Sequence, residues 1–316
     1  MIRTVLGDIS ADKLGHVQCH EHIFLEKDKS YEVSSVLYMD DFEKSLGELN
    51  DYKEAGGGTI VDAQPVLSGR MAENLIKASK KSGVNIVAST GFHKAVFYYD
   101  DSYIFTDDED KITQLYIDEI KDAMLGSKSI SAVKVPAKAG MIKTAVDSFG
   151  IAGEKVYEKL FSAAANACTS TGAPVMCHIE KGADALETVE FFTKRGVDPS
   201  HIIICHLDRA KYDKVYHKEV LATGVYFDYD TVNRLKYLSH EQELEIIAAM
   251  LEAGYGDKIM LSLDTTNARL RAYGADMGLD YILKSFIPMM KKYGISDEDI
   301  LKMTKENAKK ALSFWK

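Results

Sequence analysis

Residues 174–208, PVMCHIEKGADALETVEFFTKRGVDPSHIIICHLD, carry the pattern on which the prediction of the fold rests. An apolar run at Pro174–Ile179 is followed by an amphipathic stretch at Ala183–Lys194 and by a second apolar run at His201–Leu207. Near-continuous apolar runs of this length are typical of parallel strands that are covered on both faces. The order strand, helix, strand with short connections therefore predicts one unit of a parallel sheet.

The same alternation extends over the whole chain of 316 residues. The predicted strands are His16–Phe24, Thr59–Gln64, Asn85–Thr90, Ser131–Val135, Pro174–Ile179, His201–Leu207, Gly224–Tyr229 and Lys258–Asp264. The predicted helices are Asp41–Ala55, Met71–Ser82, Lys111–Leu125, Glu154–Thr171, Ala183–Lys194, Glu241–Ala253, Tyr281–Tyr293 and Asp297–Phe314. Eight such units favour a closed (β/α)8 (TIM) barrel of the α/β class. An open doubly wound sheet is the alternative, which the absence of a GxGxxG turn disfavours.

Composition limits the classes of function. The net charge of −9 argues against general nucleic-acid binding, and no apolar run approaches the roughly 20 residues of a membrane span. The start, MIRTVLGDIS, lacks the pattern of a signal peptide, and the four cysteines form no CxxC pair. No Pro/Gly/Ser-rich linker interrupts the chain. We therefore expect a single domain over residues 1–316, in the cytoplasm, bound neither to a membrane nor to nucleic acid.

Six side chains suited to metal binding lie in the predicted strands or at their carboxyl ends. They are His20, His22, Lys134, His178, His206 and Asp264. Alternate strand residues point the same way, so the imidazoles of His20 and His22 can reach one metal ion. Taken singly, each residue has an ordinary structural role, such as a salt bridge or a helix N-cap. Because the carboxyl ends of barrel strands meet at one mouth, the set predicts a metal site there.

The sequence also resembles a known family. The runs CHEHIF, IVDAQP, NIVASTGFH, AVKV, VMCHIE, ICHLDR and LSLD occur in the order seen in the phosphotriesterase-like branch of the amidohydrolase superfamily. The resemblance implies a binuclear centre and a homodimer. His20, His22 and Asp264 would hold the buried metal and His178 and His206 the exposed one, with Lys134 bridging both as a carboxylated lysine. Some family members have Glu at the bridging position, where this chain has Lys.

The implied centre has a plausible chemistry. Imidazole and carboxylate ligands suit zinc, manganese or cobalt, with zinc the commonest. Burial lowers the pKa of a lysine and so favours its reaction with CO2. Two ions about 3.5–4 Å apart can share a hydroxide. Our hypothesis is that this hydroxide attacks the substrate while Asp264, the predicted catalytic residue, takes and redelivers the proton.

The resemblance permits phosphotriesters, lactones and related esters, and it is greatest to lactonases that open phosphorylated sugar lactones. In α/β barrels the loops after strands seven and eight often form a phosphate site. The candidates for substrate binding are Tyr98, Arg209, Lys211, Lys236, Arg269, Arg271 and Tyr273. Arginine and lysine both suit a phosphate monoester, so we expect a small-molecule substrate, a phosphorylated 1,4-lactone.

Three alternatives remain. The cations can instead cap or pair locally on a solvated surface. The enzyme can be a lactonase or esterase for neutral lipophilic substrates, such as acyl-homoserine lactones, with weak phosphotriesterase activity. The barrel can also bind metal without catalysis, which the six filled ligand positions disfavour.

Overall fold

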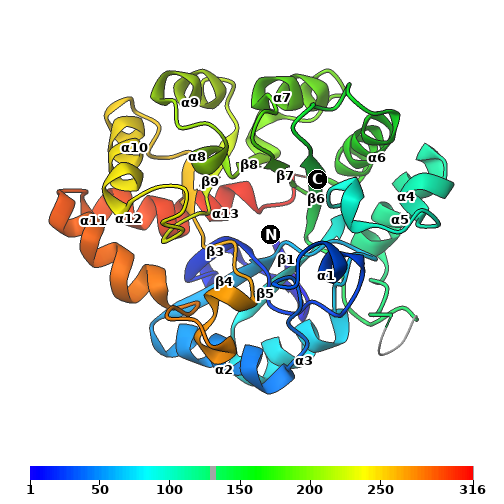
Figure 1. The fold of residues 1–316 in the computed structure, drawn as a ribbon, viewed down its shortest axis with the longest axis horizontal. Coiled ribbons are helices and arrows are strands. Elements are labelled where there is room, and N and C mark those ends of the chain that lie inside the picture. The colour runs from blue at the N-terminus through cyan, green and yellow to red at the C-terminus, as the bar shows by residue number, and fades with distance from the viewer. Residues whose placement is uncertain (129–132, 316) are drawn as a thin grey trace.

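The computed structural model describes residues 1–128 and 133–315. Its centre is a barrel of parallel strands inside a ring of helices (Figure 1). The strands are β3 (His16–Glu21), β4 (Gly57–Asp62), β5 (Asn85–Gly91), β6 (Met141–Val146), β7 (Val175–Ile179), β8 (Ile202–Cys205), β9 (Tyr226–Tyr229) and β10 (Ile259–Leu261). Neighbours in the barrel are also neighbours in the sequence. Between β10 and β3 the Asp264 N–H donates to the His20 carbonyl oxygen at 3.1 Å. The predicted (β/α)8 barrel is confirmed.

The helices follow the strands along the chain. They are α1 (Lys29–Val33), α2 (Phe42–Glu54), α3 (Ala72–Ser82), α4 (Tyr103–Thr106), α5 (Glu109–Lys121), α6 (Lys155–Thr171), α7 (Ala185–Thr193), α8 (Leu207–Ala210), α9 (Lys214–Leu221), α10 (His240–Glu252), α11 (Ile287–Tyr293), α12 (Asp297–Leu301) and α13 (Asn307–Ala311). π-Helical turns at Ile282–Phe286 and Lys302–Glu306 precede α11 and α13. Local sequence sets several ends: Ser239 and Gln242 form a capping box on α10. Within 1–128 and 133–315, no helix has the length and apolarity needed to cross a membrane.

The fourth strand differs from the prediction. Of the expected strand Ser131–Val135, residues 131 and 132 lie outside the described residues, and 133–135 contribute only an antiparallel bridge between Lys134 and Leu125. The barrel uses β6 instead, which pairs with β5 through Ser89 and Met141. Pro136 follows directly after the expected strand and has no N–H to donate to a ladder, which disfavours a central strand there.

Apolar side chains fill the amino end of the barrel. Inside it pack Val17, Cys19, Val61, Val87, Met141, Met176, Ile203 and Met260, together with Ile2, Leu14, Ala308, Ala311 and Leu312 from outside the strands. Ile2 belongs to an antiparallel hairpin that the sequence did not predict, β1 (Ile2–Thr4) and β2 (Gly7–Ile9). A larger apolar cluster lies between the strands and the surrounding helices. With the amino end closed by apolar packing, the polar side chains collect at the carboxyl ends of the strands.

Candidate metal centre

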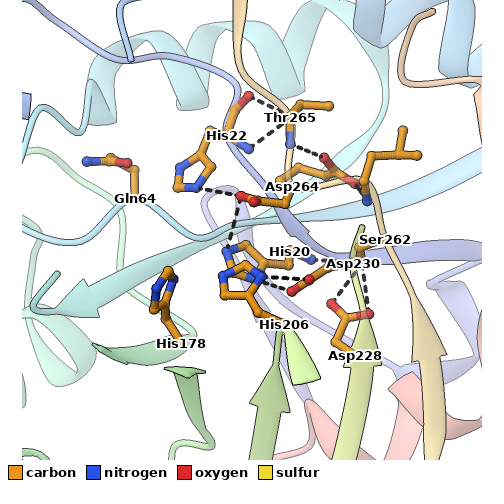
Figure 2. A network of polar contacts seen from close by, with 12 residues as sticks. His20, His22, Gln64, His178, His206, Asp228, Asp230, Ser262, Asp264 and Thr265 are labelled. Atoms are coloured by element: carbon orange, nitrogen blue, oxygen red, sulfur yellow. Dashed lines mark hydrogen bonds and ion pairs between the residues drawn. The ribbon is translucent and has the colours of Figure 1, made fainter. Parts of the chain in front are cut away.

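An irregularity in β3 delivers two imidazoles to the mouth of the barrel. The pairing register of β3 with β4 shifts between Gln18 and Glu21. Within this irregular stretch, Cys19 Sγ lies 3.5 Å from Met260 Sδ in the interior apolar cluster. Directly after Cys19, His20 places its Nε2 3.8 Å from Asp264 Oδ1, and His22 places its Nε2 3.5 Å from the same oxygen (Figure 2). Bulges of this kind redirect side chains beside active sites, and here the shift lets consecutive residues serve the core and the site.

The lysine of the site is Lys143, and the prediction of Lys134 is wrong. Lys143 lies in the middle of β6, is fully buried, and places Nζ 3.0 Å from His20 Nε2. Burial lowers the pKa of this lysine. Lys134 has a half-exposed side chain and lies 3.8 Å from Asp118 on α5, outside the barrel strands. The sequence held a signal for Lys143, because MIKTAV is also an apolar run around a lysine and no proline follows it.

His178 and His206 complete the group of imidazoles. His178 lies in β7 and His206 directly follows β8, and their ring centroids are 4.3 Å apart. The rings of His206 and His20 are 4.7 Å apart. His206 and Asp264 both adopt positive φ, 68° and 49°. Such backbone costs a non-glycine residue about 1–3 kcal/mol and concentrates at functional sites. The predicted grouping of these two histidines with His20, His22 and Asp264 is therefore observed.

Two further residues of the site were not predicted as functional. Asp230 directly follows β9 and places its carboxylate oxygens 2.8 Å from His20 Nδ1 and 2.6 Å from His206 Nδ1. His93, which follows β5, packs its ring against His178 with 5.5 Å between centroids and lines the mouth. The signal for Asp230 was its position at a strand end, equivalent to that of Asp264.

These residues fit a divalent metal ion. Ligand atoms of His20, His206 and Asp264 all lie within 4.8 Å of one another. Burial lowers the pKa of His20 and of His206, so both rings are neutral, which is the form that ligates metal. His22 Nδ1 is buried and has no hydrogen-bond partner among the described residues. The other ring nitrogen, Nε2, lies 3.5 Å from Asp264 Oδ1, so the ring of His22 also faces this group. Imidazole and carboxylate donors suit zinc, manganese or cobalt.

A cavity of about 610 Å³ opens above the imidazoles. Of the predicted substrate residues, Arg209, Lys236 and Arg269 line it, and so does Arg234. Arg234 lies 3.0 Å from Asp264 Oδ2, and Arg269 donates to the Val232 carbonyl oxygen at 2.6 Å. The cations after strands six, seven and eight therefore do meet at one cavity.

Four other predicted substrate residues do not line this cavity, and their assignment is corrected. Each has a local partner that holds it elsewhere. The Tyr98 hydroxyl accepts from the His93 N–H at 3.1 Å, and Lys211 Nζ stacks on the ring of Tyr216 at 3.4 Å. Arg271 pairs with Asp51 and Asp280, both at 3.2 Å, and the Tyr273 hydroxyl lies 2.8 Å from Ser45 Oγ. For these residues the local-pairing alternative applies.

Comparison with known proteins agrees with this site. The model of the phosphotriesterase family matches residues 1–312. A phospho-furanose lactonase of Mycoplasmopsis synoviae is 32% identical over 99% of this chain and 91% of its own length. An aryldialkylphosphatase of Saccharolobus solfataricus is 30% identical over 96% and 97%. The crystal structure of a lactonase from Listeria monocytogenes has a TM-score of 0.90 and 29% identity, covering 100% of this chain and 99% of that one. A divalent metal centre is implied by this family and fits the buried histidines and aspartates. The chain belongs to the phosphotriesterase family and is a hydrolase of that family.

Proposed function

We propose that the protein is a binuclear metal-dependent lactonase that opens a phosphorylated 1,4-lactone of a sugar. The observation that carries the proposal is that four cations from the segments after β8, β9 and β10 line the same cavity as the imidazoles. These are Arg209, Arg234, Lys236 and Arg269. The similarity to a relative named phospho-furanose lactonase supports the phosphorylated substrate.

Six side chains would hold the metal ions. His20, His22 and Asp264 would bind one ion and His178 and His206 the other, with Lys143 in the bridging place first assigned to Lys134. When bound, the two ions supply Lewis acidity that polarises the substrate carbonyl and lowers the pKa of a water molecule. Zinc is the expected metal, and manganese or cobalt suits the same donors.

Lys143 becomes an anionic ligand only after carboxylation. Its neutral amine forms a C–N bond to CO2 and loses one proton, which leaves a carbamate. The buried, apolar position in β6 favours the neutral amine, since burial lowers the pKa of Lys143. A solvent-exposed lysine such as Lys134 would stay an ammonium ion at neutral pH.

Asp264 is placed to move the proton. Although burial alone would raise the pKa of its carboxyl, the charge on Arg234 and the hydrogen bond with His22 hold that pKa well below its usual value. The carboxylate is therefore ionised, which is the form that can accept a proton from the attacking water. As the acyl C–O bond of the lactone breaks, Asp264 returns that proton to the departing ring oxygen.

Lys236 and Arg209 are the best placed to bind a phosphate group. Both lie near the ring of Tyr237, with Lys236 Nζ 4.6 Å and the Arg209 guanidinium carbon 5.4 Å from its centroid. Arg269 is less free, because its guanidinium already donates to the carbonyl oxygens of Val232 and Asn233. A phosphate at this rim would meet one flexible ammonium and one guanidinium fork.

A test compares kcat/KM for γ-lactones with and without a 5-phosphate, using a pH indicator to follow ring opening. Lys236→Met should remove most of the preference for the phosphorylated lactone, about tenfold or more. Lys211→Met is the control, since Lys211 lies outside the cavity. An unchanged preference in Lys236→Met would contradict the proposed phosphate subsite.

A neutral lipophilic substrate remains the second candidate, and one feature of the cavity favours it. Val36, Leu37, Phe97 and Leu235 give the lining an apolar sector. The similarity to an aryldialkylphosphatase points in the same direction. A wild-type preference for unphosphorylated acyl lactones or for phosphotriesters would favour this candidate.

A further inference from the structure

We infer that Asp230 is a positioning residue that fixes the tautomer of one imidazole in each half of the proposed binuclear centre. The inference rests on that centre. Asp230 is fully buried, and its two oxygens contact different rings: Oδ1 lies 2.6 Å from His206 Nδ1 and Oδ2 lies 2.8 Å from His20 Nδ1 (Figure 2). One carboxylate thus serves ligands assigned to two different ions.

The chemistry of the carboxylate dictates where the ring protons sit. A neutral imidazole carries one N–H, and only the other nitrogen has a lone pair for a metal. A carboxylate accepts hydrogen bonds and donates none, so it favours the N–H at Nδ1 of both rings. In His20 the opposite nitrogen, Nε2, lies 3.0 Å from Lys143 Nζ and 3.8 Å from Asp264 Oδ1, on the side of the other ligands. Asp230 therefore leaves Nε2 available on the metal-binding side.

The two contacts differ in quality. The contact with His206 is a well-formed hydrogen bond. The contact with His20 is short, but its angle does not suit a hydrogen bond. The backbone next to Asp230 is held in place, because Asp208 accepts a hydrogen bond from the Thr231 N–H at 3.0 Å. Asp208 lies two residues after His206, so the ends of β8 and β9 are tied together beside the shared carboxylate.

Asp230→Asn tests the inference because the amide is nearly isosteric but has only one acceptor oxygen. Its NH2 group, facing an Nδ1, requires that nitrogen to accept, which moves the ring proton to Nε2 and blocks ligation. His206, which has the better-aligned hydrogen bond, should keep the amide oxygen as its acceptor. His20 should then face the NH2 group and no longer bind metal through Nε2. We expect one binding step near wild-type affinity and the other weaker by about 10- to 100-fold.

Asp230→Ala gives a second, independent pattern. Both rings then lose the same acceptor, and water can accept from either Nδ1–H in the space that opens. In Asp230→Ala both metal-binding steps should therefore weaken. Each should weaken by less than the one step that Asp230→Asn disrupts. A residue that only fills space would make Ala the more damaging change, so the order of the two variants separates positioning from packing.

The measurement is a titration of the metal-free full-length chain with Co²⁺, followed by its absorption spectrum and by calorimetry. Glu48→Gln is the control: Glu48 is also a buried carboxylate, but its oxygens accept from the Ala272 and Leu279 N–H groups at 2.6 and 3.1 Å, away from the imidazoles. It should keep two wild-type binding steps. Two unchanged steps in Asp230→Asn, or an equal loss in Glu48→Gln, would overturn the inference. A wild-type chain that binds fewer than two ions would instead overturn the binuclear centre on which the inference rests.

Discussion

Lys143 Nζ lies 3.0 Å from His20 Nε2 inside the barrel, although the two residues are 123 positions apart in the sequence. The contact joins β3 to β6 across the interior, and both side chains are buried. Among the described residues, no carboxylate lies within ion-pair distance of Lys143 Nζ to stabilise a positive charge there. This arrangement is explained if the amine becomes a carbamate that shares metal ions with the histidines.

Lys143→Met should therefore remove metal binding, because the neutral side chain cannot become an anionic bridge. Metal analysis of the purified protein should find fewer than two ions per chain, with affinity reduced at least about 10- to 100-fold. Lys134→Met is the control and should keep the wild-type content, since Lys134 pairs with Asp118 at the surface. The reverse result would restore the original assignment of Lys134.

Asp264→Asn should separate proton transfer from metal binding. The amide retains one oxygen as a ligand but cannot take up a proton, so kcat should fall by about 10²- to 10⁴-fold. Metal content should change little by comparison. The two quantities are measured on the same preparation, by lactone hydrolysis and by elemental analysis. Near-wild-type turnover would exclude Asp264 as the proton carrier.

Gly91→Ala should disturb the position of Lys143. Gly91 has φ of 93°, and a Cβ there would lie 1.9 Å from the Lys143 carbonyl oxygen, so the backbone of β6 must move. Gly274→Ala is the control, with φ of 101° but no atom within 4 Å of the added Cβ. The control should lose about 1 kcal/mol of unfolding free energy. Gly91→Ala should lose clearly more and should also bind metal more weakly. Chemical denaturation and Co²⁺ titration check this, and equal losses of stability in the two variants would contradict the steric account.

His217 should contribute to acid sensitivity. Its ring is fully buried between the Tyr229 hydroxyl and the Lys211 carbonyl oxygen, each at 2.8 Å, and burial lowers its pKa from 6.5 to about 4. As the pH falls below about 6.5, His217 becomes protonated in the unfolded chain but stays neutral in the folded chain. The unfolding free energy therefore falls until the pH reaches about 4. The loss from this residue is roughly 3 kcal/mol.

His217→Gln should flatten that part of the profile. Urea denaturation between pH 7 and pH 4.5 compares the two proteins, and the variant should lose roughly 2–3 kcal/mol less than the wild type over this interval. Parallel profiles would show that His217 is not the group responsible.

The sequence predicted the barrel well because its strands and helices have clear and different periods. It failed at the fourth strand, where two runs, AVKV and MIKTAV, each enclose a lysine. Apart from the proline that follows the first run, only the pairing of the second run with β5 and β7 distinguishes them. Strand-end histidines could be read directly, since the carboxyl ends of barrel strands converge. Asp230 could not be assigned its role, because that depends on the distances to two rings from other strands.

The cations show the same limit. Arg209, Lys236 and Arg269 line the cavity, while Lys211 and Arg271 follow the same strands but turn toward Tyr216 and toward Asp51 and Asp280. The position of a residue in a loop predicts which end of the barrel it occupies. The direction of a long side chain depends on local partners that sequence patterns do not reveal.

The most direct test of the proposed centre is anomalous diffraction from crystals of the protein grown with Zn²⁺. The account predicts two anomalous peaks about 3.5–4 Å apart, one beside His20, His22 and Asp264 and the other beside His178 and His206. Electron density for a carboxylated Lys143 should lie between them. A single peak, or two peaks with Lys143 as a free amine remote from both, would contradict the account.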